Sequence, residues 1–128
     1  MKATILFGHG SRDPVWRVPI DTVAQRMLAI DPQCCVRCSF LEITEPDLAT
    51  TTAELVAFGV DSITIVPMFL GVGRHAREDL PVLVTALQRD YPQVSFLLQP
   101  SVGEDARVVE LLAQIAMPTS KPQNPVVT

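Results

Sequence analysis

Apolar residues along this chain fall into short continuous runs that alternate with segments of helical periodicity. Between the runs, apolar side chains recur every three or four residues, as in Ile20, Val23, Ala24, Met27 and Leu28. The runs themselves are typical of strands buried on both faces of a sheet, and they cover about residues 2–8, 34–41, 61–66 and 93–99. This alternation predicts an α/β fold with a four-stranded parallel sheet, right-handed crossovers and flanking helices.

Capping residues and prolines predict where the helices begin and end. The first helix is expected to stop at Pro32. The second is expected to begin at Thr44 as its N-cap and to end at Gly59. Asp79 and Pro81 mark the expected start of the third helix.

Length and composition fit one domain. The chain has 128 residues, of which 48% are apolar and 19% charged, which favours a folded protein over a disordered one. A last helix is expected over about residues 104–116, so residues 1–117 form the predicted domain. Residues 118–128 contain several prolines and no periodicity, and they predict a flexible C-terminal tail.

Charge and hydropathy narrow the class of partner. A net charge of -4 argues against a general nucleic-acid binder, which needs a basic surface to neutralise phosphates. No apolar run approaches the roughly 18 residues that a membrane-spanning helix requires, and the first residues do not resemble a secretory signal. We therefore expect a cytoplasmic protein without nucleic-acid or membrane partners.

The cysteines are interpreted as small apolar residues of a buried strand. Cys34, Cys35 and Cys38 fall in one expected strand, and their odd number fits a reducing compartment. Cys35 and Cys38 have CxxC spacing, but residues three apart on a strand point to opposite faces. These thiols are therefore not expected to share a metal.

Candidate chemistry is concentrated at two histidines, the only ones in the chain. His9 follows the first expected strand between two glycines, and His75 lies in a glycine-containing loop after the third. Parallel sheets bind ligands at the carboxyl ends of their strands. Imidazole binds transition metals and accepts a proton near neutral pH, so this placement predicts metal chemistry.

Two familiar glycine motifs are incomplete at the first of these loops. A dinucleotide fingerprint that begins at Gly8 would need glycine where Asp13 stands. Ser11 lacks the flanking glycines of a nucleophile elbow. The glycines are better explained as positions that let the backbone approach a ligand closely or adopt a positive φ.

Charged residues join the histidines at the same edge. Arg12, Arg74 and Arg77 predict a positive rim suited to an anionic ligand. The alternative is that each arginine is solvated and paired with a neighbouring carboxylate. Glu42 and Glu45 follow the second strand, where either could accept a proton or hydrogen bonds, although Glu45 could simply favour the nearby helix N-terminus.

Five short motifs occur in a fixed order along the chain: Gly8–Arg12, Leu41–Pro46, Val66–Leu70, Gly73–His75 and Asp79–Pro81. Together they resemble the CbiX-type sirohydrochlorin chelatases, which are class II chelatases, over about residues 1–116. The resemblance implies insertion of cobalt, nickel or iron into sirohydrochlorin, an anionic tetrapyrrole. The divalent metal would be a substrate, with no permanently bound cofactor. The resemblance also implies a chain equivalent to half of a longer class II chelatase and working as a homodimer.

The resemblance also implies roles for individual residues. His9 would be a metal ligand and the proton acceptor, and His75 would be the second metal ligand. The substrate-binding positions would be Glu45, Leu70, Gly71, Val72, Gly73, Arg74 and His75. Auxiliary positions would be Gly10, Ser11, Arg12 and Glu42.

Two other functional classes compete with a chelatase. A non-catalytic tetrapyrrole or metal carrier could use the same pocket, and only turnover separates it from an enzyme. A metal-dependent hydrolase is disfavoured, because we expect neither histidine to have a carboxylate partner at tight spacing.

Physical reasoning also favours a homodimer. One small sheet offers a single shallow edge, so a two-fold partner is expected to supply a second wall around the macrocycle. An exposed apolar patch would be costly, which places some of Met68, Phe69, Leu70 and Val72 at the cleft or the dimer interface. The alternative is that these four residues cover the core above the third strand.

Overall fold

Strands and helices alternate along the chain, as the hydrophobic pattern predicts. The computed structural model describes residues 1–118, so the predicted tail beyond Pro118 lies outside the described residues. The strands are β1 (Lys2–Gly8), β2 (Val36–Phe40), β3 (Ser62–Pro67) and β4 (Ser95–Leu98). The α-helices are α1 (Val18–Ile30), α2 (Leu48–Ala57), α3 (Arg74–Asp90) and α4 (Ala106–Ala116). Short 3-10 helices precede α1 and α4, namely η1 (Pro14–Arg17) and η2 (Val102–Glu104).

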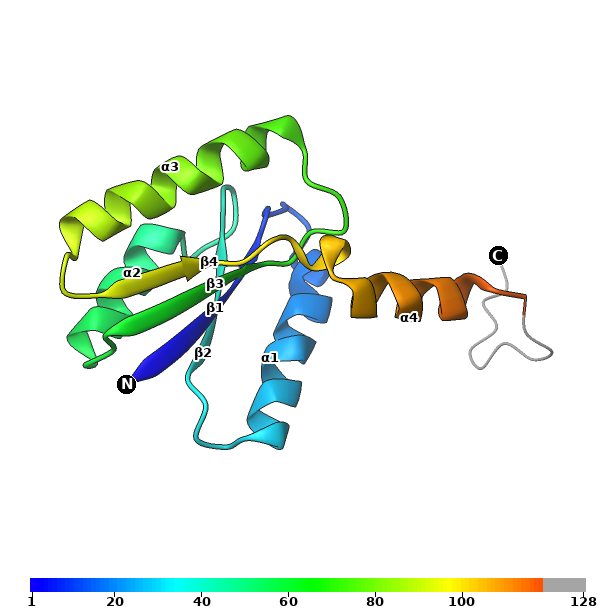
Figure 1. Cartoon of the computed structure of the whole chain (residues 1–128), viewed down its shortest axis with the longest axis horizontal. Helices are drawn as coiled ribbons and strands as arrows, with labels where there is room; N and C mark the ends of the chain where they lie inside the picture. Colours follow the sequence, from blue (N-terminus) through cyan, green and yellow to red (C-terminus); the bar gives the residue numbers. More distant parts are fainter. Residues whose placement is uncertain (119–128) are drawn as a thin grey trace.

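The four strands form one parallel sheet in the order β2-β1-β3-β4. Helices α2 and α3 cover one face of this sheet, and α1 covers part of the other face (Figure 1). The predicted α/β class and parallel sheet are therefore confirmed. Because all strands run the same way, the loops that follow them meet at one edge.

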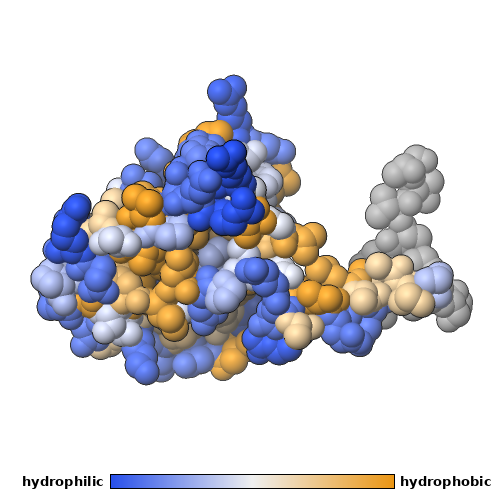
Figure 2. Space-filling model, turned by 45° about the horizontal axis from the view of Figure 1, so that its top comes forward, coloured by the Kyte–Doolittle hydropathy of each residue, from blue (hydrophilic) through white to orange (hydrophobic). Residues whose placement is uncertain are grey.

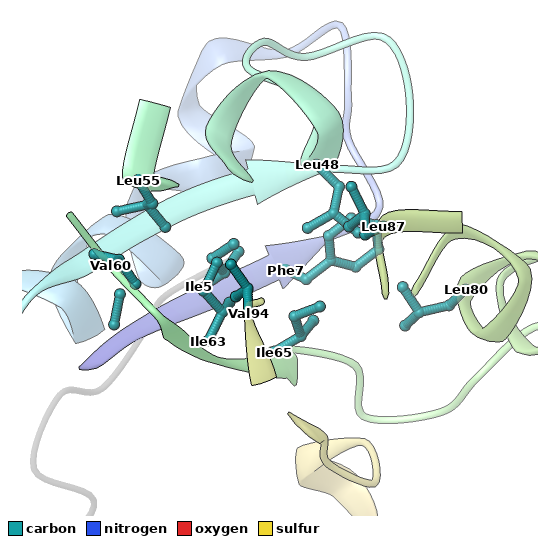
Figure 3. Packing of buried hydrophobic residues seen from close by; sticks show 11 residues of the cluster. Ile5, Phe7, Leu48, Leu55, Val60, Ile63, Ile65, Leu80, Leu87 and Val94 are labelled. Atoms are coloured by element: carbon teal, nitrogen blue, oxygen red, sulfur yellow. The ribbon is translucent and has the colours of Figure 1, made fainter. Parts of the chain in front are cut away.

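The core lies mainly between the sheet and the pair α2 and α3. Ile5 and Phe7 of β1 and Ile63 and Ile65 of β3 belong to one cluster with Leu48 and Leu55 of α2 (Figure 3). A second, smaller cluster on the opposite face joins the sheet to α1, and its buried members are Leu6, Ile20, Val36 and Phe40. Strand β1 alternates its side chains between these two clusters, whereas β4 contributes Phe96 and Leu98 to the first cluster alone.

Strand β2 is shorter than expected, which changes the interpretation of the cysteines. It begins at Val36, so Cys34 and Cys35 precede it and only Cys38 lies within it. All three are free thiols and half-buried. Cys34 and Cys38 pack against the α1 cluster and Cys35 against the main core, which agrees with their predicted role as small apolar residues.

Two predicted helix starts are wrong. Asp47, not Thr44, is the N-cap of α2, because its carboxylate accepts a hydrogen bond of 2.8 Å from the Thr50 N–H. Helix α3 begins at Arg74, before the expected start at Asp79, and Pro81 lies inside it. Pro81 faces solvent, where the loss of one backbone hydrogen bond is tolerated.

Helix α4 differs from the other helices, because none of its residues is buried. It leaves the sheet after η2 and projects away from the rest of the described chain (Figure 1). Within residues 1–118, no helix has the length and apolar character needed to cross a membrane.

Candidate functional site

The loop after β1 and the loop after β2 are joined backbone to backbone at the carboxyl edge. The Leu41 N–H donates to the Gly8 carbonyl at 2.9 Å, and the Glu42 N–H donates to the His9 carbonyl at 3.1 Å. Gly10 has a φ of +108°, and a Cβ added there would stand 1.8 Å from the Glu42 carbonyl oxygen. Only glycine allows this approach, so Gly10 serves the shape of the loop.

Ser11 and Thr44 lock the same two loops together. The Ser11 N–H donates to Thr44 Oγ1, and that hydroxyl donates to the Ser11 carbonyl, both at 2.9 Å. This use of Thr44 explains why it does not cap α2. Arg12 is exposed beside this lock, where its guanidinium faces solvent.

His9 lies beside a carboxylate. His9 Nε2 is 3.7 Å from Glu42 Oε1, and the two side chains are 45% and 44% exposed. The distance is too long for a hydrogen bond but short enough for a carboxylate to stabilise a protonated imidazole. The structure therefore brings the predicted residues His9 and Glu42 together. The Glu45 side chain is exposed, and its carbonyl accepts a hydrogen bond of 3.3 Å from Arg17.

Arg17 contacts the loop after β2 through the Glu45 carbonyl, a role that is not among the sequence predictions. Its guanidinium pairs with Asp21 at 2.9 Å and lies 4.7 Å from the centre of the Phe40 ring. The hydrogen bond from Arg17 lowers the pKa of Asp21. Burial, together with the Asp21 charge, raises the pKa of the neighbouring Cys38 to about 11. Cys38 is therefore a protonated thiol near neutral pH and a poor metal ligand or nucleophile.

His75 lies on the first turn of α3, not in the preceding loop as expected. Its Nε2 is 2.6 Å from Asp79 Oδ2, one helical turn further on. The expectation that neither histidine has a carboxylate partner is therefore wrong, and the argument against a metal-dependent hydrolase that rested on it no longer holds. The four-residue spacing from His75 to Asp79 places both on one helix face and is the sequence signal that could have revealed the pair.

Arg74 is paired with Glu78 at 3.0 Å, with both side chains largely exposed. This matches the alternative of a solvated, paired arginine. An exposed ion pair of this kind contributes little free energy, so the guanidinium remains available to an incoming anion.

The segment between β3 and α3 forms one wall of a cavity of about 390 Å³. Leu70, Gly71 and Val72 line it together with residues 98–101, at and beyond the end of β4, and the first turns of α3. Its charged lining residues are Arg77 and Glu104. Volume and lining are those of a small-molecule pocket. Glu104 is not among the predicted site residues.

The apolar residues at this edge divide between the two expected roles. Met68 and Phe69 are half-buried and pack against the two core clusters, so they cover the core. The Phe69 ring meets Phe7 edge to face, with centroids 6.2 Å apart. Leu70 is 70% exposed, and Val72 is half-buried at the cavity. Leu70 therefore remains a candidate for a cleft or an interface.

The two histidines share the carboxyl edge but not a common ligand cluster. Within residues 1–118, no group of three or more His, Cys, Asp or Glu side chains is placed to hold a metal ion. His9 with Glu42 and His75 with Asp79 are therefore two separate pairs. This arrangement fits donors that hold a metal loosely better than a closed structural metal site.

The fold and this edge define a class of protein, an α/β domain with one histidine in the loop after β1 and a second on the first turn of the helix that follows the adjacent strand β3. The profile of the CbiX family matches residues 3–117, and the chain belongs to this family. The sirohydrochlorin cobaltochelatase of Methanococcus aeolicus is 32% identical over 88 residues, which is 69% of this chain and 62% of that protein. The chain thus spans about three fifths of the length of that relative.

Solved structures show the same fold. A putative cobalamin biosynthesis CbiX protein from Marinobacter aquaeolei VT8 matches 90% of this chain and 93% of its own, with a TM-score of 0.77 and 27% identity. The sirohydrochlorin chelatase SirB from Bacillus subtilis subspecies spizizenii, in complex with cobalt, has a TM-score of 0.74 and 26% identity. That match covers 89% of this chain but 49% of SirB, so this chain corresponds to one half of the longer protein.

Proposed function

We propose that this chain is a cytoplasmic chelatase that inserts a divalent metal ion into sirohydrochlorin, with cobalt favoured over nickel and iron. The observation that carries this proposal is the pair of histidines at the carboxyl edge of a CbiX-family domain, each beside a carboxylate. The names of the Methanococcus relative and of SirB support the substrate and the metal. Three free thiols fit a reducing compartment.

The metal is a substrate, so the protein must bind it and then release it into the macrocycle. Two imidazoles from His9 and His75 supply nitrogen donors that suit cobalt, nickel and iron. Because no carboxylate or thiolate completes a larger group with them in the described chain, coordination positions stay open for the pyrrole nitrogens.

Metal entry displaces two pyrrole N–H protons. Once the metal has passed from His9 to the macrocycle, the freed imidazole accepts one of these protons and water accepts the other. The Glu42 carboxylate, 3.7 Å from His9 Nε2, stabilises the imidazolium that forms. Both side chains are partly exposed, so the proton then passes to water. Charge stays balanced, because one divalent cation enters as the protons leave.

Asp79 positions the second histidine. A proton on His75 Nε2 shared with Asp79 leaves the Nδ1 lone pair free for the metal. The carboxylate also fixes the direction of the ring on an otherwise exposed helix turn. Asp79 touches neither metal nor macrocycle in this scheme and acts through His75.

The macrocycle carries several carboxylates, which the exposed guanidiniums of Arg12 and Arg74 can bind. Its flat apolar surface would rest on Leu70, Gly71 and Val72, with Gly73 and Glu45 as further substrate-binding positions. A single chain offers one such wall. We therefore propose a homodimer that holds the macrocycle between the carboxyl edges of two copies.

A visible-absorbance assay with sirohydrochlorin tests this function. With cobalt(II) in excess and protein at about one hundredth of the macrocycle concentration, we expect many turnovers per chain. A spectral change limited to one macrocycle per chain would identify a carrier instead. Turnover with nickel(II) or iron(II) but not with cobalt(II) would mean that cobalt is not the metal substrate. No acceleration of insertion with any of the three metals would refute the proposal.

A further inference from the structure

Ile43, in the loop after β2, has a backbone conformation that its side chain disfavours. Among residues 1–118 it is the one non-glycine residue with a positive φ, which is +67°. The Thr44 N–H donates to the Glu42 carbonyl at 2.6 Å, so the chain turns back across Ile43 alone. A turn of this kind with a positive φ at its central residue is a γ-turn of the rare and strained type. Glycine or asparagine adopts a positive φ at much lower cost than a β-branched residue.

The loop requires the turn but not the isoleucine. On one side of the turn, the Glu42 N–H donates to the His9 carbonyl at 3.1 Å. On the other side, the Thr44 hydroxyl bonds to both the N–H and the carbonyl of Ser11 at 2.9 Å. These bonds fix the residues before and after Ile43 and involve none of its side-chain atoms. Glycine or asparagine at position 43 would therefore give the same loop with less strain.

The Ile43 side chain has no role in the core either. It belongs to neither of the two core clusters, and it is 61% exposed. Exposure alone does not mark a site, because apolar side chains are also exposed elsewhere, for example along the projecting helix α4 (Figure 2). Ile43 differs because backbone strain adds to the exposure, and packing in the described core offsets neither. Strain at an exposed apolar residue beside a candidate site indicates a contact with a ligand.

Ile43 stands on one side of His9, and Leu70 stands on the other. Strand β1 lies between β2 and β3, so the His9 loop lies between the loop that carries Ile43 and the segment that carries Leu70. Leu70 is 70% exposed. These two apolar residues follow strands that are two spacings, or roughly 10 Å, apart. A flat tetrapyrrole ring placed over His9 is wide enough to reach both.

We propose that Ile43 supports the apolar ring of the macrocycle on the β2 side of His9, opposite Leu70 on the β3 side. Ile43 is then a substrate-contacting residue, and the strained turn presents an apolar side chain to the ring. Its neighbours Glu42 and Glu45 would repel the carboxylates of the macrocycle, so the contact is with the ring itself. This inference rests on the proposed function and adds a residue to its binding surface.

Replacement of Ile43 by asparagine separates strain from contact. Ile43→Asn keeps a side chain of similar length that tolerates a positive φ, so the Tm should rise by about 2–8 °C. The same variant loses the apolar contact. Because about three fifths of Ile43 is exposed before the ring covers it, the Kd for metal-free sirohydrochlorin should rise by about 5–20-fold in a fluorescence titration. A structural role alone predicts the change in Tm without the change in Kd.

Two further variants serve as matched controls. Ile43→Val keeps the strained β-branched residue and removes one CH₂ group, so the Kd should rise by only about twofold. Ile30→Asn makes the same substitution at the end of α1 that leads into β2, away from the carboxyl edge, where Ile30 is 73% exposed. Its Kd should equal that of the wild type. Sedimentation of each variant checks that its oligomeric state is that of the wild type.

Four results would overturn the inference. These are a wild-type Kd in Ile43→Asn, an equal rise of the Kd in Ile30→Asn, a Tm that does not rise in Ile43→Asn, and a rise of the Kd that accompanies dissociation of the subunits. The visible-absorbance assay distinguishes these results from failure of the proposed function. Wild-type protein that turns over while Ile43→Asn binds the macrocycle equally well keeps the function and removes the inference. Wild-type protein that binds the macrocycle more tightly than Ile43→Asn but does not insert metal does the reverse.

Discussion

Gly10→Ala tests the contact that fixes the His9 loop. Gly10 has a φ of +108°, and a Cβ there would stand 1.8 Å from the Glu42 carbonyl oxygen. Gly59, at the end of α2, has a φ of +102° with no atom within 4 Å of an added Cβ. Gly59→Ala therefore adds backbone strain alone, whereas Gly10→Ala adds the same strain and a steric clash. The difference between the two variants measures the close approach.

The expected magnitudes follow from the local geometry. A residue other than glycine at positive φ costs about 1–2 kcal/mol, which is the expected loss for Gly59→Ala. In Gly10→Ala the clash is with backbone, so the two loops must separate. Separation weakens the bonds from Glu42 to His9 and from Leu41 to Gly8, each worth about 0.5–1.5 kcal/mol. We expect Gly10→Ala to lose about 1–3 kcal/mol more than Gly59→Ala.

Urea unfolding measures this difference, and the insertion rate measures its consequence. Gly59→Ala should turn over at the wild-type rate. Gly10→Ala should be slower by about a hundredfold, because displacing His9 by about 1 Å spoils its geometry toward the macrocycle. Equal unfolding free energies and equal rates for the two variants would refute the reasoning.

Three further predictions concern single side chains. Asp79→Ala should lower cobalt(II) affinity and insertion rate by about 10–100-fold, with partial rescue in Asp79→Asn; unchanged affinity and rate would remove Asp79 from the site. Arg74→Ala should raise KM, leave kcat and metal affinity nearly unchanged and reduce the salt dependence of KM, whereas the control Glu78→Ala should not raise KM. A KM unchanged in both Arg74→Ala and Arg12→Ala would mean that neither arginine binds the substrate. The pKa of Cys38, about 11, predicts slow labelling by a thiol reagent at pH 8 when Cys34 and Cys35 are serines, and fast labelling in urea. Equally fast labelling of the folded protein would contradict the buried, protonated thiol.

The order and type of the elements could be predicted because strands and helices differ in hydrophobic period. The start of α3 could not, because its N-cap Gly73 has no side chain to signal it, whereas Asp79 and Pro81 carry the usual signals further on. The bond of 3.0 Å from the Arg77 N–H to the Gly73 carbonyl marks the first turn. Ala76 is buried within that turn, so tertiary packing rather than local helix propensity decides where α3 begins.

The sequence predicted which strands the site residues follow, but it did not predict which of those residues contact one another. His9 and His75 follow adjacent strands, which already places them at one edge. The approach of Glu42 to His9 depends on the pairing of β1 with β2, which no local pattern encodes. The exposure of α4 likewise could not be predicted from the sequence, because an apolar stripe predicts that a helix is buried but does not indicate which surface covers it.

Metal insertion by histidine variants tests the central claim most directly. His9→Ala, His75→Ala and the double variant are compared with wild type in the visible-absorbance assay with sirohydrochlorin and cobalt(II). Circular dichroism serves as the control for folding, and both side chains are exposed enough to be removed without loss of the core. We predict that His9→Ala lowers the insertion rate by at least about a hundredfold and that the double variant is inactive. A double variant that inserts cobalt at the wild-type rate would contradict the account.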